Sequence, residues 1–241
     1  MKRIKQKLSE VLDFSKSSQI TLVLFIEIVL GVLFTLAMLA VFFKLGEDVI
    51  DKEVIFFDEA IMHFIYSFHS PFLTSIMEKV TFLGGEIFLG GATLITILLL
   101  FRKHKKDAVI FAFILVFGVG LNLLLKHMFQ RPRPDLMPLI HEITYSFPSG
   151  HAMNSFVFYI SLSYFIFRNT ANKKLGLMLS GLSAIIIFLI GLSRIYLGVH
   201  YPSDVLAGYV AGFGWFVIAL VFEKTLIFLR LFRKYEVDKK Y

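Results

Sequence analysis

Three short segments of this 241-residue chain hold most of the residues that can do chemistry: 126–133, 148–151 and 193–204. Each is rich in side chains that bind phosphate or transfer protons, and each lies at the end of a long apolar run. Together they supply histidines, a carboxylate and several cations. Such a set of groups, gathered at one membrane surface, suits the removal of a phosphate from a lipid.

The first segment is predicted to clamp an anion. Lys126 ends an apolar run, and Arg133 follows seven residues later. Pro132 and Pro134 exclude helix there, so the backbone must bend and can bring the two cations together. The planar Arg fork and the Lys point charge then bind phosphate oxygens. Arg131, by contrast, is interpreted as an interfacial charge whose head snorkels to water.

The second segment opens the next apolar run. Ser149 can cap the helix or donate its hydroxyl to an anion, and Gly150 allows close backbone approach. The free N–H groups at a helix start also attract an anion. His151, in the first turn, is placed to protonate a leaving oxygen. An ordinary helix cap is the alternative interpretation.

The third segment combines a cation with a histidine–carboxylate pair. Arg194 adds a phosphate donor, and His200 and Asp204 are four residues apart. In helical or near-helical geometry the carboxylate can reach a ring nitrogen. Asp204 would then accept the Nδ1 proton and leave Nε2 of His200 free to attack, with the orienting logic of a catalytic triad. A purely structural pair is the alternative.

The composition indicates an integral membrane protein. Hydrophobic residues make up 57% of the chain, which includes 28 Phe, and the mean hydropathy is +0.75. The absence of cysteine excludes disulfides and thiolate metal sites. Because lipid forbids open strands, the long apolar runs are predicted to be helices, giving an all-α six-helix bundle in a single membrane domain, 1–241. The predicted spans are about 20–43, 80–101, 108–125, 152–168, 176–192 and 205–223.

The basic residues predict the orientation. With the N-terminus inside, the inner segments hold 18 Lys and Arg and the outer segments hold 7. This asymmetry places both termini in the cytoplasm and all three chemically rich segments on the extracytoplasmic side. The inner segments are 1–19, 102–107, 168–175 and 224–241, and the outer segments are 44–79, 126–150 and 193–204.

The segment between the first two spans is predicted to form an interfacial amphipathic helix that ends at Ser70-Pro71. A plain extracytoplasmic lid is the alternative. Glu27 and Glu86 lie inside predicted spans, where a charge is costly, so both are expected to face the bundle interior. For Glu86 a hydrogen bond between helices is favoured over a place at the substrate entrance. The apolar residues at helical spacing in the interfacial helix are Phe57, Ile61, Phe64, Ile65 and Phe68.

The three segments resemble the signature motifs of the type-2 phosphatidic acid phosphatase superfamily, with no departure at a key position. The resemblance covers 126–212 firmly, as a phosphatase motif core. It implies a metal-independent and cofactor-free mechanism through a phosphohistidine, with His200 as nucleophile, Asp204 as its partner and His151 as general acid. It implies that the phosphoryl oxygens are bound by Lys126, Arg133, Ser149, Gly150 and Arg194.

The expected partner is a lipid phosphate in the bilayer, with no nucleic acid and no obligate protein partner. Phosphatidylglycerol phosphate, phosphatidic acid and undecaprenyl pyrophosphate are the expected substrates. In a bacterial cell, the last would connect the enzyme to recycling of the cell-wall carrier lipid. Two other functions remain open. A phosphotransferase would pass the same phosphoryl group to another hydroxyl, and a non-enzymatic lipid binder or flippase would not need either histidine.

Overall fold

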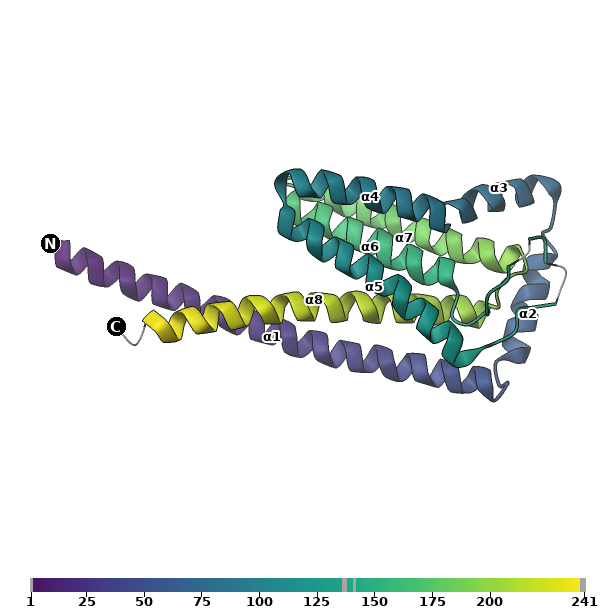
Figure 1. Cartoon of the computed structure of the whole chain (residues 1–241), viewed down its shortest axis with the longest axis horizontal. Helices are drawn as coiled ribbons and strands as arrows, with labels where there is room; N and C mark the ends of the chain where they lie inside the picture. The colour runs from purple at the N-terminus through teal and green to yellow at the C-terminus, as the bar shows by residue number, and fades with distance from the viewer. Residues whose placement is uncertain (1, 136–137, 141, 239–241) are drawn as a thin grey trace. The chain divides into compact units, whose positions relative to one another are not determined.

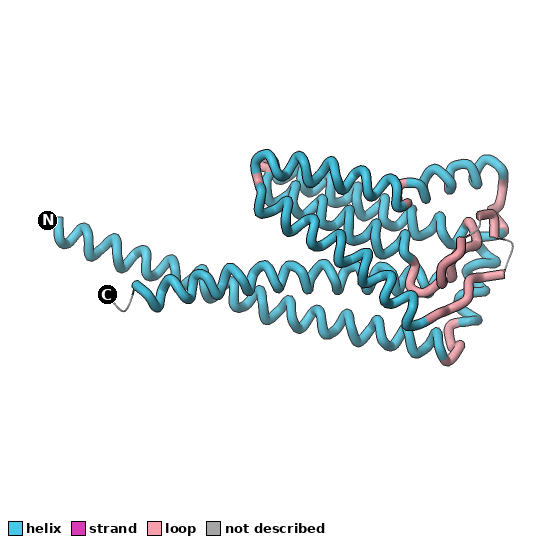
Figure 2. The backbone as a smooth tube through the Cα atoms, viewed as in Figure 1, coloured by secondary structure: helices cyan, strands magenta, loops and turns pink. Residues whose placement is uncertain are grey.

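The computed structural model describes residues 2–135, 138–140 and 142–238, with side chains described between 19 and 232. Every regular element in the described chain is a helix, as the composition predicts (Figures 1 and 2). The helices are α1 (Lys2–Ile50), α2 (Ile55–Tyr66), α3 (Pro71–Phe82), α4 (Glu86–Lys103), α5 (Lys105–Phe129), α6 (Gly150–Asn169), α7 (Lys173–Tyr196) and α8 (Pro202–Asp238).

The chain separates into two compact units, and α1 and α8 contribute to both. The unit 38–216 holds all three chemically rich segments. In the other unit, formed from 1–37 and 217–241, the Nζ atom of Lys224 lies 2.5 Å from Oε2 of Glu27. This ion pair gives the Glu27 charge a partner within the apolar stretch of α1, which lowers the cost of placing a carboxylate there.

By length and composition, four of the described helices are apolar enough to cross a bilayer. A fifth span results if α3 and α4, which meet at a bend of 41°, are counted as one. The predicted count of six is therefore not confirmed, because α6 does not meet the same test. Several serines of α6 are buried between helices, and one of them, Ser163, donates a 2.7 Å hydrogen bond to Ser183 on α7. The four segments are Gln19–Ile50, Lys105–Phe129, Lys173–Tyr196 and Pro202–Phe232.

The region between the first two spans differs from the prediction. A helix does lie there, but α2 ends at Tyr66, and Ser70 caps a further helix, α3, by accepting the N–H of Leu73 at 3.2 Å. The face that α2 buries contains Asp58 and Met62. Three members of the predicted apolar face are exposed, which is compatible with contact to lipid, and the interfacial position of the helix stays a prediction. The exposed members of that face are Phe57, Phe64 and Phe68.

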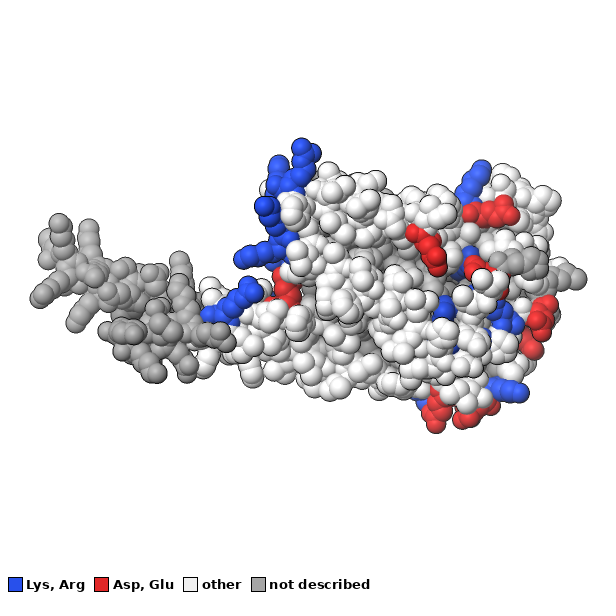
Figure 3. Space-filling model, viewed as in Figure 1, with Lys and Arg blue, Asp and Glu red and all other residues white. Residues whose placement is uncertain are grey.

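The helices of the 38–216 unit bring the chemically rich segments to one end of the bundle (Figure 1). There α4, α6 and α8 begin, and α5 and α7 end. On the face shown in Figure 3, Lys and Arg gather at the opposite end, around the α4–α5 and α6–α7 turns, and most of the surface between the ends is uncharged. Large exposed apolar side chains such as Leu98 on α4, Val116 on α5 and Phe188 on α7 are expected of surfaces that meet lipid.

Candidate active site

His200 and Asp204 form the buried centre of the candidate site. Gly198, with φ of 73°, turns the chain after α7, and His200 follows in the short connection before α8. Its Nδ1 lies 3.5 Å from Oδ2 of Asp204, and both side chains are almost fully buried. The structure therefore brings the predicted pair together, although the imidazole comes from the turn before α8 and not from the helix itself.

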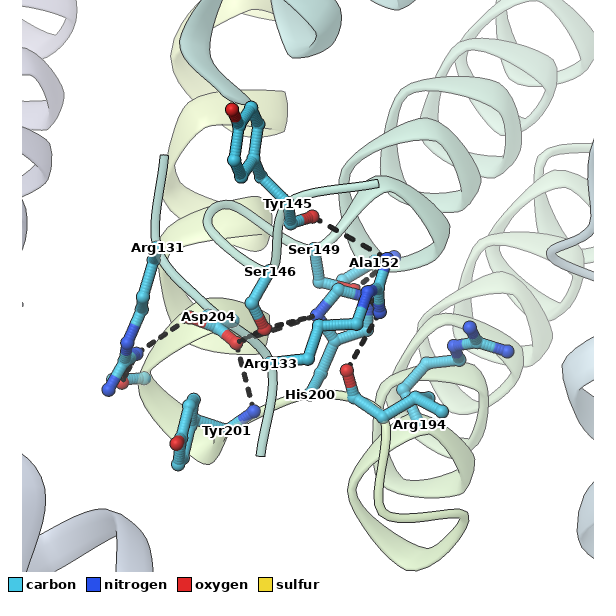
Figure 4. A network of polar contacts seen from close by, with 12 residues as sticks. Arg131, Arg133, Tyr145, Ser146, Ser149, Ala152, Arg194, His200, Tyr201 and Asp204 are labelled. Atoms are coloured by element: carbon cyan, nitrogen blue, oxygen red, sulfur yellow. Dashed lines mark hydrogen bonds and ion pairs between the residues drawn. The ribbon is translucent and has the colours of Figure 1, made fainter. Parts of the chain in front are cut away.

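Ser146 is a member of this centre that sequence reasoning missed (Figure 4). Its hydroxyl lies 3.3 Å from Nδ1 of His200 and donates a hydrogen bond to Oδ2 of Asp204. The backbone N–H of Tyr201 donates to the same carboxylate oxygen at 2.9 Å. Sequence offers little to single out one serine in a long loop, since its importance comes only from the fold beside it.

The opposite edge of the imidazole faces Arg133. Nη1 of Arg133 lies 3.3 Å from Nε2 of His200 and donates to the carbonyl of Val199 at 2.8 Å. Its Nε donates to the carbonyl of Thr144 at 2.7 Å, which fixes the guanidinium plane. Because Arg can only donate, Nε2 is the acceptor, and the neutral ring carries its proton on Nδ1. Nδ1 is the nitrogen that faces Asp204.

The burial of His200 keeps its ring neutral. Burial lowers the pKa of His200 to about 4, and this effect outweighs the nearby Asp204 carboxylate, which raises it. Arg194 and Arg133 lower the pKa further because they disfavour a second positive charge. At neutral pH the ring is therefore an uncharged base with its Nε2 lone pair beside a guanidinium.

Lys126 and Gly150 meet at the wall of the site. Lys126, in the last turn of α5, is buried, and its Nζ donates to the carbonyl of Tyr145. A Cβ atom on Gly150 would lie 3.1 Å from Oδ1 of Asn122 on α5. The absence of a side chain thus lets the start of α6 press against α5, next to the lysine.

Ser149 ties the second segment to the third. Its backbone N–H donates to the carbonyl of Asp204 at 3.0 Å, and its Oγ accepts the N–H of Ala152 at 3.5 Å, the geometry of a weak cap. The hydroxyl is fully buried, and Ser149 does not line the cavity described below. The structure thus gives it the capping position that the sequence left as one alternative.

Arg194 lies behind the cavity wall and is buried. It donates to Oγ1 of Thr81 at 2.9 Å and to Oε1 of Glu142, a residue of the long loop between α5 and α6. The other Glu142 oxygen lies 3.9 Å from Nη2 of Arg133, so one carboxylate contacts two predicted phosphate donors. Burial raises the pKa of the Glu142 carboxyl, but the guanidinium groups of Arg194 and Arg133 together outweigh it, so the pKa lies below its ordinary value.

Arg131 corrects the sequence interpretation. Its side chain is only 10% exposed, and it does not snorkel to water. Nη1 lies 2.6 Å from Oδ1 of Asp204, and Nη2 lies 2.8 Å from Oδ2 of Asp58 on α2. The guanidinium is held between two fully buried carboxylates, because the fold brings α2 against the start of α8. Asp58 was also missed, because it is one of several acidic residues between the first two predicted spans.

A cavity of about 600 Å³ connects the candidate site to the space between α4, α5 and α6. One end of it is polar and the other is lined by apolar side chains such as Leu89, Leu115 and Val119. Glu86 lies on the wall of this cavity, a position closer to the less favoured prediction, a place at the substrate entrance, than to a hydrogen bond between helices. The predicted site residues that line the cavity are Lys126, Arg133, Gly150, His151 and His200, and those that do not are Ser149, Arg194 and Asp204.

Comparison with known proteins identifies the family of this chain. The model of the PAP2 superfamily matches residues 107–228. Phosphatidylglycerophosphatase B of Bacillus subtilis is 36% identical over 178 residues, which is 70% of this chain and 84% of that protein. Undecaprenyl-diphosphatase BcrC of the same organism is 30% identical over 174 residues, or 69% of this chain and 81% of that protein.

A solved structure has the same fold. The crystal structure of a transmembrane PAP2-type phosphatidylglycerolphosphate phosphatase from Bacillus subtilis superposes with a TM-score of 0.75 and 32% identity, covering 79% of this chain and 96% of that one. Fold and site together thus define a helical, multi-pass membrane protein of the phosphatase type. The chain belongs to the PAP2 superfamily.

Proposed function

We propose that this protein is a lipid phosphatase that removes a phosphate from a lipid phosphate or pyrophosphate through a phosphohistidine at His200. The observation that carries the proposal is the contact of Arg133 with Nε2 of His200, while Nδ1 faces the buried Asp204 carboxylate. A neutral imidazole whose unprotonated Nε2 lies beside a phosphate-binding cation is suited to attack phosphorus.

The reaction would proceed in two displacements. Nε2 of His200 forms a bond to phosphorus as the bond from phosphorus to the lipid oxygen breaks. His151, which takes up a proton when the anionic substrate binds, gives that oxygen a proton. Asp204 stabilises the positive charge that develops on the attacking ring. His151 then takes a proton from a water molecule as its oxygen attacks phosphorus, the bond from phosphorus to nitrogen breaks, and phosphate leaves with the enzyme restored.

The charge that builds up on the phosphoryl oxygens would be met by side chains and helix starts. Lys126 and Arg133 line the cavity, and Gly150 is the first residue of α6, where N–H groups lack helical partners. Arg194 and the Ser149 hydroxyl are also proposed as donors to the phosphoryl oxygens, although neither residue lines the cavity. Fixed donors of this kind stabilise a phosphoryl transition state, so we propose that no metal ion is required.

The substrate would be a lipid that keeps its tail in the apolar part of the cavity and its head at His200. The relatives are named as phosphatases of phosphatidylglycerol phosphate and undecaprenyl diphosphate. We therefore propose phosphatidylglycerol phosphate, undecaprenyl pyrophosphate and phosphatidic acid as candidate substrates. The basic residues around the α4–α5 and α6–α7 turns support placing the site end on the extracytoplasmic face.

The test is phosphate release from these three lipids by purified protein in detergent with EDTA. Replacement His200→Ala should lower kcat on the order of 10³-fold or more, because the proposed nucleophile is removed. His127→Ala is the matched control. His127 is an exposed histidine in the last turn of α5 that does not line the cavity, so the variant should retain activity.

Undiminished release by His200→Ala would refute the nucleophile assignment, and loss of wild-type activity in EDTA would refute the metal-free scheme. The same assay separates a hydrolase from a phosphotransferase when a lipid or sugar alcohol is added. Transfer would yield a phosphorylated acceptor in place of an equal amount of free phosphate.

A further inference from the structure

A second polar cluster adjoins the candidate site. Figure 4 shows one of its members, Arg131, on the side of Asp204 that faces away from His200. The cluster consists of Asp58 on α2, Arg131 in the loop after α5 and Ser203 in the first turn of α8. Asp58 is fully buried and Ser203 is 1% exposed. None of the three lines the cavity, so the cluster does not itself contact a substrate there.

Asp58, which lies on α2, accepts hydrogen bonds from the start of α8. Its Oδ1 accepts the backbone N–H of Ser203 at 2.8 Å, and its Oδ2 accepts the Ser203 hydroxyl at 2.6 Å. Ser203 is the second residue of α8, where an N–H has no partner within the helix. A carboxylate there also meets the positive end of the helix dipole. Asp58 thus fixes the position of the turn that carries Asp204.

Arg131 fixes the orientation of the Asp204 carboxylate. Its Nη1 is shared between Oδ1 of Asp204, at 2.6 Å, and the Ser203 hydroxyl, at 2.8 Å. The guanidinium also lies over the ring of Tyr201, with its Cζ 4.0 Å from the ring centroid. With Oδ1 held in this way, rotation of the carboxylate is restricted, and Oδ2 is left for the edge that faces Nδ1 of His200.

We infer that Asp58 and Arg131 form a positioning pair, which directs one oxygen of Asp204 at His200 and balances the charge behind it. This inference rests on the proposed reaction at His200. In this arrangement the two residues act only through Asp204. The pair keeps the imidazole in the tautomer with its proton on Nδ1 and Nε2 unprotonated. Through Asp58, α2 contributes to the orientation of the nucleophile.

The two charges of the pair have opposite effects on the imidazole. Without the Arg131 charge, Asp204 is less neutralised and favours a protonated ring more strongly. Without the Asp58 charge, Arg131 acts more strongly on Asp204, and a protonated ring is disfavoured. The other charged and titratable groups that act on His200 or Asp204 stay unchanged in both variants: Lys126, Arg133, Glu142, His151, Arg194 and Tyr201.

The experiment measures kcat/KM against pH for Arg131→Gln and Asp58→Asn. We expect the acid limb, where protonation disables His200, to move to higher pH in Arg131→Gln and to lower pH in Asp58→Asn. For Arg131→Gln, kcat should fall on the order of tenfold or more with little change in KM, because the phosphate donors remain. Glu59→Gln, which removes an exposed carboxylate next to Asp58 on α2, should leave the acid limb in place.

An equal loss at every pH, or a shift in the same direction in both variants, would reduce the pair to a structural anchor and overturn the inference. If Arg131→Gln does not fold, Arg131→Lys carries the test. Lys keeps the charge but lacks the fork that bridges the two carboxylates, so kcat should still fall with KM retained. Unchanged kcat in that variant would contradict the positioning role.

A second readout does not depend on activity. The chain has seven histidines, so ¹⁵N-histidine NMR in detergent, with the His200→Ala spectrum subtracted, can report the tautomer and titration of His200. If wild-type protein hydrolyses none of the lipids, the proposed function fails, while this measurement still tests the pair. Opposite shifts of the His200 titration support the pair, and unshifted titrations overturn it.

Discussion

At the scale of single residues, two neighbouring arginines have separate partners. Arg133 reaches the Nε2 edge of His200, whereas Arg131 turns to the carboxylates of Asp58 and Asp204. Arginine suits both places because its fork keeps its charge and binds two partners at once. The carboxylate of Glu142 contacts the guanidinium groups of Arg194 and Arg133, which the proposed reaction needs.

Replacement of Glu142 by Gln is predicted to strengthen the binding of free phosphate. Its carboxylate contacts Arg194 and lies 3.9 Å from Arg133, so an incoming phosphate competes with it for the same donors. Because the pKa of Glu142 lies below its ordinary value, the carboxylate is ionised at neutral pH. We expect inorganic phosphate to inhibit Glu142→Gln at several-fold lower concentration than wild type, measured as a competitive inhibition constant.

The matched control is Glu78→Gln. Glu78 is an exposed carboxylate on α3, so its replacement changes the net charge by the same amount without touching either arginine. An inhibition constant that stays at the wild-type value in Glu142→Gln, or moves equally in Glu78→Gln, would contradict direct competition at the site.

At the scale of elements, α6 is central to the site. It packs against α4, α5 and α7, and its first turn presents His151 to the cavity. The cavity then continues along α4 and α5, where one wall is formed by a residue without a side chain, Gly90. A helix pair with an apolar gap that ends at a polar cluster is suited to a ligand with a tail and an anionic head.

Filling that gap is predicted to block long lipids selectively. A Cβ atom on Gly90 would meet no atom within 4 Å, so Gly90→Phe can be accommodated and should project into the cavity. We expect large loss of activity on a long-chain lipid phosphate and retained activity on a short-chain, water-soluble phosphate ester. The measurement is the ratio of kcat/KM for the two substrates.

Gly91 provides the control for this substitution. It is the next residue of α4, a Cβ there also meets nothing within 4 Å, and it does not line the cavity. Gly91→Phe should keep the wild-type ratio. Equal ratios in the two variants would mean that the lipid tail does not use this gap.

At the scale of the whole molecule, the distribution of charge relates the site to the membrane. The basic turns α4–α5 and α6–α7 lie at one end of the 38–216 unit and the candidate site lies at the other (Figures 1 and 3). Because Lys and Arg are retained on the cytoplasmic side, the site end is expected to face outward. A lipid phosphate would then be hydrolysed in the outer leaflet.

Cysteine labelling is predicted to show this orientation directly, since the chain has no cysteine of its own. Ile143→Cys introduces a thiol at an exposed position of the site end, and Lys106→Cys introduces one at the basic end. In intact cells a membrane-impermeant maleimide should label residue 143 and reach residue 106 only after permeabilisation. The reverse pattern would invert the proposed topology.

The amino-acid sequence alone was sufficient for the all-helical membrane class and for the three segments that meet at the site. Apolar runs and prolines are local signals, so they predict helices and breaks without knowledge of the neighbours. They did not predict the separate helix α3, because polar residues such as Ser75, Glu78 and Lys79 interrupt its apolar pattern. They also predicted six spans, whereas α6 buries serines that make it less apolar than a lipid-facing helix.

The partners of the charged residues were decided only by the tertiary structure. His200 and Asp204 are close in sequence, so their pairing was predictable from spacing. Asp58 with Arg131, and Glu142 with Arg194, join segments far apart in the chain. In the sequence, a charged residue near an apolar run gives the same pattern whether its side chain extends into water or is buried against a carboxylate. The choice depends on which helices pack together and on the need of a buried charge for a partner.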